Sequence, residues 1–466
     1  MKNIISTLIT ILLILTPLAV LADTINIPGD QPTIQAGIDA ASDGDTILLA
    51  DGIYTGNGNY NVDSGGTSVT IKSANSPGNC IIDCRQNGLG FLFQSGETIT
   101  LENLTIKNAD GGASSGGGVY EGKSSKLTII NCVLDSNTAM YGGAVYCDSS
   151  SSLTIEKSSF TNNSASKHGG AIAHMYTSGN ATCSITASTF KHNVSGNYGG
   201  AVYTYETEFN RCTFTDNKAN TKGGAICFYL NSSSTISNCT FQKNISSEGG
   251  AIHSTYQASV TCTNCSFSQN NATTAGGAIW HDITDSQGNH FNLKNCILWG
   301  DTSPNEPEIF ANNNPAEITY SDIEGAGANP TNHNIDQNPL FLFLESSRQL
   351  YLHPESPCID SGTSENAPPD DIDGFLRPIP DPGNYDMGAY EYRGDIYIWD
   401  GGSTSNWTTS SNWKNNTVPA ASNIVIIASS TATTDPIIEG EHTIKLILLE
   451  SKTLTISLGK LIVGGS

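Results

Sequence analysis

Basic residues are scarce in this chain of 466 residues: 21 Lys and Arg stand against 44 Asp and Glu, a net charge of −23. Proteins that bind nucleic acid or anionic lipid need Lys and Arg to meet the phosphates, so this composition argues against both partners. Only 14% of residues are charged, which excludes a disordered polyelectrolyte. Apolar runs are also short: beyond residue 22, no segment approaches the ~18 consecutive apolar residues of a membrane-spanning helix.

The N-terminus holds the longest apolar run. Lys2 precedes a mostly apolar segment, residues 4–15, and small or apolar residues at 20–22 offer a cleavage site before Asp23. This arrangement is typical of a secretory signal peptide. A membrane anchor is the alternative, but the segment is short for ~30 Å of hydrocarbon. We therefore expect the mature chain to begin near Asp23, to leave the cytoplasm and to contain no membrane-spanning segment.

Glycine is abundant, with 47 residues, and much of it recurs in the motif Gly-Gly-Ala-Val/Ile. The glycine pairs lie 24 to 30 residues apart and begin at Gly116, Gly142, Gly169, Gly199, Gly223, Gly249 and Gly276. Eight or nine residues before most pairs stands Phe-x-x-Asn, with Leu134 as a variant of the Phe. The asparagines of this second motif are Asn137, Asn163, Asn193, Asn217, Asn244 and Asn270. A fixed period of this length indicates a repeat architecture.

The repeat predicts an all-β fold, a right-handed parallel β-helix of the pectate-lyase-like solenoid type. Each unit holds short strand-sized runs, such as residues 153–155 and 158–160, separated by turn residues. Helical repeats would need amphipathic runs of ten or more residues at a period of 3.6, and none is present. Units of this kind stack as successive coils, so that equivalent residues lie ~4.8 Å apart in neighbouring coils.

Each conserved position of the repeat then forms a column along the solenoid. We expect the Phe column to point inward, and the asparagine column to form a hydrogen-bonded ladder at a turn. The glycine pair permits a tight bend with positive φ, after which Val or Ile returns to the interior. A small residue precedes each Phe or Leu by two positions, at Cys132, Ser158, Ser188, Cys212, Cys239, Cys265 and Cys296.

Gly-Gly-Ala-Ile paired with Phe-x-x-Asn resembles the repeats of the chlamydial polymorphic membrane proteins, over about residues 110 to 300. The resemblance implies a surface-exposed β-helix associated with adhesion. Residues 24–56, which include an expected amphipathic helix at 33–41, resemble the N-terminal cap of secreted pectate-lyase-like β-helices. The motifs in residues 335–392, such as Asp386-Met-Gly-Ala-Tyr-Glu391, resemble the choice-of-anchor domain of bacterial surface β-helices. Residues 395–466 resemble the opening of a β-module of large bacterial surface proteins.

These features divide the chain into five parts. We expect a signal peptide at 1–22, an N-terminal cap and first coil at 23–56, and β-helix repeats at 57–334. A choice-of-anchor-like closing domain follows at 335–392, and a partial β-module at 393–466. The predicted location is secreted or at the cell surface, on a bacterial outer membrane or outside the cell.

Twelve cysteines in an exported chain would ordinarily suggest disulfides. The column of Cys212, Cys239, Cys265 and Cys296 argues for buried thiols instead. Stacked residues keep parallel Cβ vectors ~4.8 Å apart, farther than the ~3.8 Å that a disulfide prefers. The pairs Cys80/Cys84 and Cys262/Cys265 keep bridging or metal binding open, although a lone CxxC is a weak zinc motif.

The sequence lacks a convincing catalytic set. Glu206/Glu208 is the best pair of acids, yet a solvated strand face explains it, and an exposed turn explains His281/Asp282. Neither cluster has a well-placed basic partner. The acids Asp370, Asp371 and Asp373 resemble a fragment of a calcium loop but lack its spacing, so a structural turn is the better interpretation. We predict no catalytic residues, no metal and no cofactor.

The most informative column lies two residues after the Ala of the glycine motif: Tyr120, Tyr146, Ala173, Tyr203, Cys227, His253 and Trp280. Period 2 turns it outward if the preceding Val or Ile points inward. We expect Tyr120, Tyr146, Tyr203, His253 and Trp280 to bind a ligand, although strand propensity and self-stacking would also explain aromatics there. The predicted function is an adhesin-like binding scaffold whose partner is a polysaccharide or a host or neighbouring surface protein. A polysaccharide lyase or glycoside hydrolase on the same fold is the alternative.

Overall fold

The computed structural model describes residues 22–463 except 176–181, 231–232, 256–257, 283–289, 313–315, 344–349, 380–382, 400, 402–403, 414–415, 421–422, 428–435, 445 and 450–454. Apart from Ala22, the expected signal peptide lies outside the described residues. Among those that are described, no helix is both long and apolar enough to cross a bilayer.

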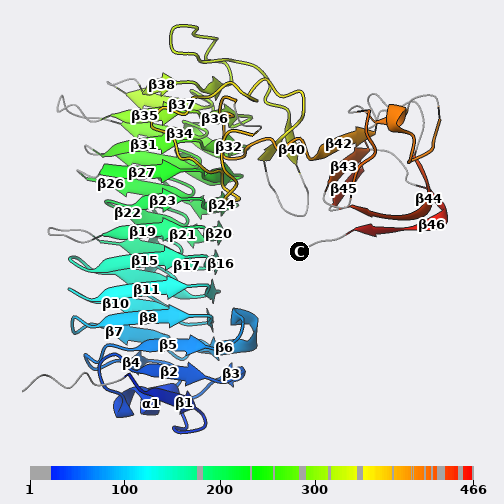
Figure 1. Cartoon of the computed structure of the whole chain (residues 1–466). Coiled ribbons are helices and arrows are strands. Elements are labelled where there is room, and N and C mark those ends of the chain that lie inside the picture. The colour runs from blue at the N-terminus through cyan, green and yellow to red at the C-terminus, as the bar shows by residue number, and fades with distance from the viewer. Residues whose placement is uncertain are drawn as a thin grey trace, which may run out of the picture.

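The described chain is a parallel β-helix in which four long sheets run side by side (Figure 1). Each full coil visits the sheets in the order first, second, third and fourth. The 12-stranded first sheet contains β1 (Thr24–Ile27), β2 (Thr46–Leu49), β5 (Thr70–Ser73), β8 (Thr98–Glu102), β11 (Lys126–Ile130), β15 (Ser152–Glu156), β19 (Cys183–Thr186), β23 (Glu208–Asn210), β27 (Ser233–Ser237), β31 (Ser259–Thr263), β35 (Phe291–Lys294) and β38 (Glu317–Thr319).

The second sheet has 11 strands: β3 (Gly52–Tyr54), β6 (Cys80–Asp83), β9 (Thr105–Lys107), β12 (Val133–Asp135), β16 (Ser159–Thr161), β20 (Thr189–Lys191), β24 (Thr213–Thr215), β28 (Thr240–Gln242), β32 (Ser266–Ser268), β36 (Ile297–Trp299) and β39 (Asp322–Ile323). The third sheet has six: β13 (Thr138–Tyr141), β17 (Ser164–His168), β21 (Val194–Ser195), β25 (Lys218–Ala219), β29 (Ile245–Glu248) and β33 (Asn271–Ala275). The fourth has ten: β4 (Val62–Asp63), β7 (Phe91–Phe93), β10 (Val119–Glu121), β14 (Val145–Cys147), β18 (Ile172–His174), β22 (Val202–Thr204), β26 (Ile226–Tyr229), β30 (Ile252–Thr255), β34 (Ile279–Asp282) and β37 (Ile309–Asn312).

The N-terminal end of the solenoid is covered by α1 (Ile34–Ala40), as the sequence predicts. The side chain of Thr33 caps this helix by accepting a hydrogen bond from the backbone N–H of Ala36. Ile34 and Ile38 lie on its buried face and join the core of the solenoid. A short 3₁₀ helix, η1 (Pro77–Asn79), follows in the early coils.

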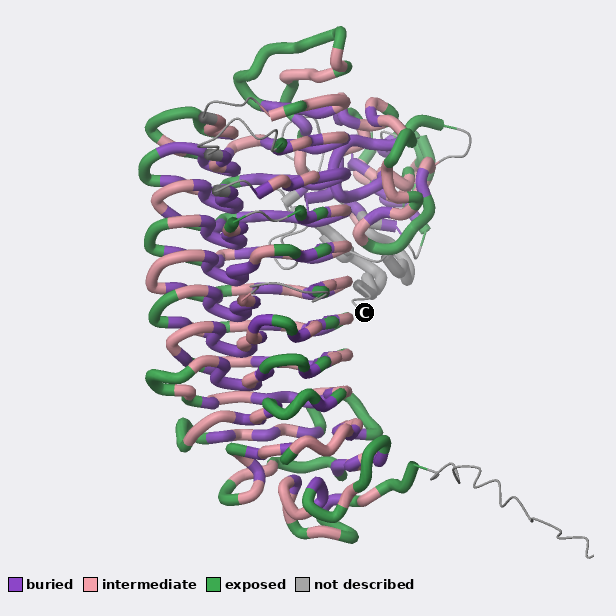
Figure 2. Tube along the Cα trace, turned by 90° about the vertical axis from the view of Figure 1, so that its left-hand side faces the viewer, coloured by how far each residue is buried: buried purple, intermediate pink, exposed green. Residues whose placement is uncertain are grey.

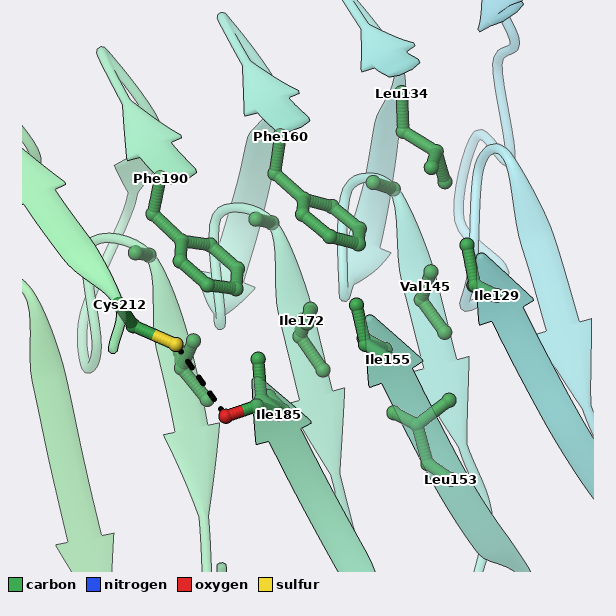
Figure 3. Close-up of a cluster of buried hydrophobic side chains, with 14 of the residues drawn as sticks. Ile129, Leu134, Val145, Leu153, Ile155, Phe160, Ile172, Ile185, Phe190 and Cys212 are labelled. Atoms are coloured by element: carbon green, nitrogen blue, oxygen red, sulfur yellow. Dashed lines mark hydrogen bonds between the residues drawn. The ribbon is translucent and has the colours of Figure 1, made fainter. Parts of the chain in front are cut away.

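The core of the solenoid is built from stacked columns. Leu134, Phe160 and Phe190 point into the same interior as the isoleucines of the first sheet (Figure 3). The rings of successive Phe residues lie 4.6–4.9 Å apart and within 8° of parallel, along the series Phe160, Phe190, Phe214, Phe241 and Phe267. The inward Phe column is thus as predicted, and Figure 2 shows the resulting alternation of buried and exposed residues in each coil.

A second column joins the predicted asparagines, all completely buried, in one hydrogen-bonded ladder. Asn217 shows the pattern: its Nδ2 donates to Oδ1 of Asn244 and to the carbonyl of Phe190, and its Oδ1 accepts from N and Nδ2 of Asn193. The same bonds link Asn137, Asn163, Asn193, Asn217, Asn244 and Asn270. The column continues to Asp301, whose Oδ1 accepts from both N and Nδ2 of Asn270.

After the last coil, the chain returns to the flank of the solenoid. β40 (Phe341–Phe343) and β41 (Leu350–Leu352) form an antiparallel pair. Residues 356–379 and 383–391 then lie against turns that join the first and second sheets, where Asp370 contacts Arg211 and Asn238. Inside this segment a buried ion pair joins Arg377 to Glu391.

The remaining strands form two small sheets. The first contains β42 (Ile396–Trp399), β43 (Ile424–Ile427) and β45 (Leu446–Leu449), and the second contains β44 (Ile437–Ile444) and β46 (Thr455–Val463). Between β42 and β43 lies the 3₁₀ helix η2 (Ser410–Asn412). Trp399, Trp407 and Trp413 form a separate buried cluster here.

Candidate functional site

The predicted ligand-binding column runs along the fourth sheet in unbroken register. Tyr120 pairs with Tyr146, Tyr203 follows two coils later, and His253 pairs with Trp280. Ala173 and Cys227 occupy the intervening positions, and Phe310 extends the column beyond Trp280. The Val or Ile before each position belongs to the interior core, so the column lies on the outer side of the sheet.

The column faces outward as expected, but two of its aromatic residues are covered by neighbouring side chains. Tyr203 is only 4% exposed and His253 is completely buried, whereas Tyr120, Tyr146 and Trp280 are half-buried. The cause is the bend at the glycine pair. Its first glycine has a φ of 59–70° in these coils, and the chain turns so sharply that the residue before the pair lies beside the outer column.

Those preceding residues form a second wall, at Tyr141, His168, Tyr198, Lys222 and Glu248. Tyr205 and Tyr229 contact Tyr203 and extend the strip. We call the outer column, the second wall and these two rings together the aromatic seam: Tyr120, Tyr141, Tyr146, His168, Tyr198, Tyr203, Tyr205, Lys222, Tyr229, Glu248, His253, Trp280 and Phe310. The sequence analysis missed the second wall. Its signal was available, because these residues recur directly before the glycine pair.

Ring stacking links much of the aromatic seam from coil to coil. The rings of Tyr120 and Tyr146 lie 5.3 Å apart and 19° from parallel. His168 stacks on Tyr198 at 4.6 Å and on Tyr203 at 4.8 Å. The series His253, Trp280 and Phe310 stacks at 6.0 and 4.0 Å. Pairs of this kind are worth ~0.5–1.5 kcal/mol beyond their burial, which fixes the ring orientations.

Three charged side chains interrupt the rings. Oε2 of Glu248 lies 3.3 Å from Nε2 of His253 and 3.8 Å from Nζ of Lys222. The hydrogen bond from His253, and the charges of His253 and Lys222, hold the pKa of Glu248 below its ordinary value. Lys222 also lies 5.8 Å from the centre of the Tyr198 ring. Burial, aided by the charge of Lys167, lowers the pKa of His168 to about 4, so this ring is neutral at physiological pH.

The acidic candidates do not converge on the aromatic seam as a catalytic pair. Glu206 and Glu208 are both exposed, with buried Thr207 between them. His281 was expected in an exposed turn, but it is buried in β34, where its ring lies 5.4 Å from that of Phe291. It points inward because it follows the outward Trp280 by one residue in a strand. The side chain of Asp282 lies outside the described residues.

The three acids that resemble part of a calcium loop, Asp370, Asp371 and Asp373, make structural contacts within the protein. Asp371 accepts hydrogen bonds from the backbone N–H groups of Phe375 and Glu391. Asp373 accepts from the hydroxyl of Tyr351, and Asp370 reaches the solenoid as described above. No group of three or more His, Cys, Asp and Glu side chains in the described part of the chain is arranged to hold a metal ion.

All twelve cysteines are free and buried, in agreement with the predicted thiol column. In the thiol column, the Sγ atoms of Cys132, Cys212, Cys265 and Cys296 lie near backbone carbonyls of the preceding coil, as in the 3.3 Å contact from Cys212 to the carbonyl of Ile185 (Figure 3). Neither Cys80 with Cys84 nor Cys262 with Cys265 forms a disulfide. The column therefore fills space in the core and offers no reactive group at the surface.

Comparison with protein families agrees with this architecture. Residues 35–221 match the family model of the right handed beta helix region. Residues 238–255 and 264–282 match the model of the Chlamydia polymorphic membrane protein repeat. The chain is thus a right-handed parallel β-helix with repeats like those of the polymorphic membrane proteins. It matches no curated protein.

Several solved structures show a distant likeness. Pectate lyase Pel9A is 13% identical, with a TM-score of 0.39, over 79% of this chain and 96% of that one. A mannuronic acid specific polysaccharide family 6 lyase from human gut microbiota is 10% identical, with a TM-score of 0.30, over 69% and 92%. The PL6 family alginate lyase AlyGC is 10% identical, with a TM-score of 0.33, over 94% and 71%. Similarity this low carries no information about the chemistry of the present chain.

Proposed function

We propose that this protein is a secreted or surface-displayed β-helix that binds an extended glycan along the aromatic seam, as an adhesin-like scaffold. The observation that carries the proposal is the seam itself: rings outside the solenoid core that repeat from coil to coil along one side. The signal-like N-terminus and the match to a membrane protein repeat support a location at the cell surface.

The geometry of the aromatic seam suits a linear ligand. Neighbouring coils place equivalent residues ~4.8 Å apart, so half-buried rings line up in short rows, Tyr120 with Tyr146 and Trp280 with Phe310. Because the ring faces stack on one another, a glycan would contact the outward ring edges and the tyrosine hydroxyls. Stacking within each row holds the rings in place before a ligand arrives, which lowers the entropy cost of binding.

Charge favours a neutral glycan over a polyanionic one. The chain carries a net charge of −23, which repels a polyanion at long range. Within the aromatic seam, the ammonium of Lys222 is already matched by Glu248 at 3.8 Å. A polyuronate would therefore meet little uncompensated positive charge in this strip.

A glycan array probed with the mature chain, residues 23–466, tests the proposal. The informative variants are Tyr146→Ala and Trp280→Ala, because both rings are half-buried. Loss of each ring's contact with the glycan should weaken binding by ~0.5–1.5 kcal/mol, roughly a 2- to 13-fold loss in affinity. Tyr320→Ala is the matched control, since this half-buried ring stacks on His333 at 4.4 Å, away from the aromatic seam. Glycan binding that survives both seam substitutions would refute the assignment.

One observation favours the enzymatic alternative. Lys222, Glu248 and His253 place acid–base groups among the rings, as a glycan-cleaving site requires. Incubation of the bound glycans with the protein, followed by assays for new reducing ends and unsaturated products, separates the two functions. Binding without products supports the scaffold, whereas turnover that Glu248→Gln abolishes would identify an enzyme.

A further inference from the structure

The last coil of the solenoid ends in a pocket with two unusual side chains. This end pocket has a volume of about 770 Å³ and is lined in part by residues of β37 and β38. These are the last strands of the fourth and first sheets (Figure 1). Ile309, Ile318 and Ile323 provide apolar wall, and the volume is within the usual range for small-molecule sites. All four charged residues that line it are acidic: Asp301, Glu306, Glu308 and Glu324.

Two of these acids are buried and incompletely satisfied. Asp301 and Glu308 are each 4% exposed, and the backbone N–H of Asp301 donates to Oε1 of Glu308 at 3.3 Å. Oδ1 of Asp301 is used by the asparagine ladder, whereas Oδ2 of Asp301 and Oε2 of Glu308 have no hydrogen-bond partner. Buried polar atoms rarely lack a hydrogen-bond partner, so these two oxygens suggest that a bound molecule supplies a donor.

The donor that fits these surroundings is a cation with an apolar body. Burial raises the pKa of both Asp301 and Glu308, and the negative charge of Asp301 further opposes ionisation of Glu308. A calcium ion would require six to eight oxygens, but the described residues contain no group arranged to hold a metal. An ammonium group needs only a few acceptors, and an aliphatic chain attached to it would contact the isoleucine walls.

We propose that the end pocket binds a primary ammonium group on an aliphatic chain, with the ammonium held by Oδ2 of Asp301 and Oε2 of Glu308. A free alkylamine and a lysine side chain of a partner polypeptide share this chemistry. The site lies at the end of the solenoid and is independent of glycan binding along the aromatic seam.

Isothermal titration calorimetry on the mature chain tests the site with hexylammonium as the probe and 1-hexanol as the uncharged control. Hexylammonium should bind once per chain and release the proton that buried Glu308 carries, so the heat should depend on the ionisation enthalpy of the buffer. Hydrogen bonds to charged groups are worth ~1.5–3 kcal/mol, so hexanol should bind at least about tenfold more weakly. Nα-acetyl-lysine amide, titrated in parallel, distinguishes a lysine side chain from a free amine as the preferred source.

Glu308→Gln should weaken hexylammonium binding about tenfold or more, whereas Glu306→Gln, an exposed acid of the same pocket, should change it less than about twofold. If Glu308→Gln fails to fold, Asp301→Asn replaces it, because the new amide keeps an acceptor oxygen for Asn270. Equal affinities for hexanol and hexylammonium, or unchanged affinity in the charge-removing variant, would overturn the proposal. Displacement of hexylammonium by equimolar calcium would also overturn it, in favour of a metal site.

Discussion

Replacement of a single ladder asparagine gives a sharp test of the stacked register. Asn217 lies in the middle of the ladder and makes four side-chain hydrogen bonds of 2.9–3.0 Å. Asn217→Ala removes all four. The backbone N–H of Asn193 and one N–H of its Nδ2 then lose their acceptor in a completely buried site.

The expected cost follows from those two donors. Each unsatisfied buried group costs ~1–3 kcal/mol, so Asn217→Ala should lower the free energy of unfolding by about 2–6 kcal/mol. Asn217→Asp should also destabilise, because a carboxylate keeps the acceptor oxygen but brings a second oxygen against the carbonyl of Phe190 and Oδ1 of Asn244. Asp is tolerated at position 301 because this residue ends the ladder and has no further rung to which it must donate a hydrogen bond.

Equilibrium urea unfolding of the mature chain, followed by near-ultraviolet circular dichroism, measures the effect. Asn220→Ala is the matched control, since Asn220 is exposed three residues further along the same coil. Its unfolding free energy should change by less than about 0.5 kcal/mol. A change as small as this in Asn217→Ala would refute the account of the ladder as a stabilising column.

Two further predictions concern buried ionisable groups. Burial raises the pKa of Glu121 from 4.5 to about 8, so the wild type should lose stability as pH rises from about 4.5 to 8, by on the order of 5 kcal/mol. Glu121→Gln should remove this loss in urea unfolding at several pH values, and an unchanged pH profile would contradict the prediction. The thiols should resist iodoacetamide in the native protein and react in 6 M guanidinium without reductant. Mass spectrometry that finds disulfides in the native chain would contradict the buried thiol column, which contains Cys212, Cys239, Cys265 and Cys296.

The sequence predicts the solenoid well because residues at equivalent positions of the repeat lie next to each other in neighbouring coils. Phe160 and Phe190 occupy equivalent places in successive repeats, and they are paired in the structure. The period-2 alternation of a strand then assigns the inner and outer sides, as at Trp280 and His281. The sequence analysis ended the ladder at Asn270 and missed Asp301, although Leu298-x-x-Asp301 takes the place of Phe-x-x-Asn.

The candidate site was less predictable because its burial depends on contacts between two columns, and the period of each column does not say how close the two columns lie. The burial of Tyr203 results from His168 and Tyr198, which reach it across a glycine bend and from neighbouring coils. The contact of Asp370 with Arg211 joins residues 159 positions apart, and no local pattern specifies such a partner. The partition of the chain at 335–392 and 393–466 stays a prediction.

The one-way hydrogen bonding of the ladder has a genetic consequence. In every bond between two rungs the asparagine nearer the N-terminus donates, and the backbone N–H of Ala109 closes that end by donating to Asn137. Any internal rung can therefore follow any other. Unequal recombination between two repeat-coding segments would add or delete one complete coil and leave each new neighbour with the partners it requires. An insertion of half a coil would instead misalign every column at once, so selection on this gene should tolerate changes of length in steps of whole repeats.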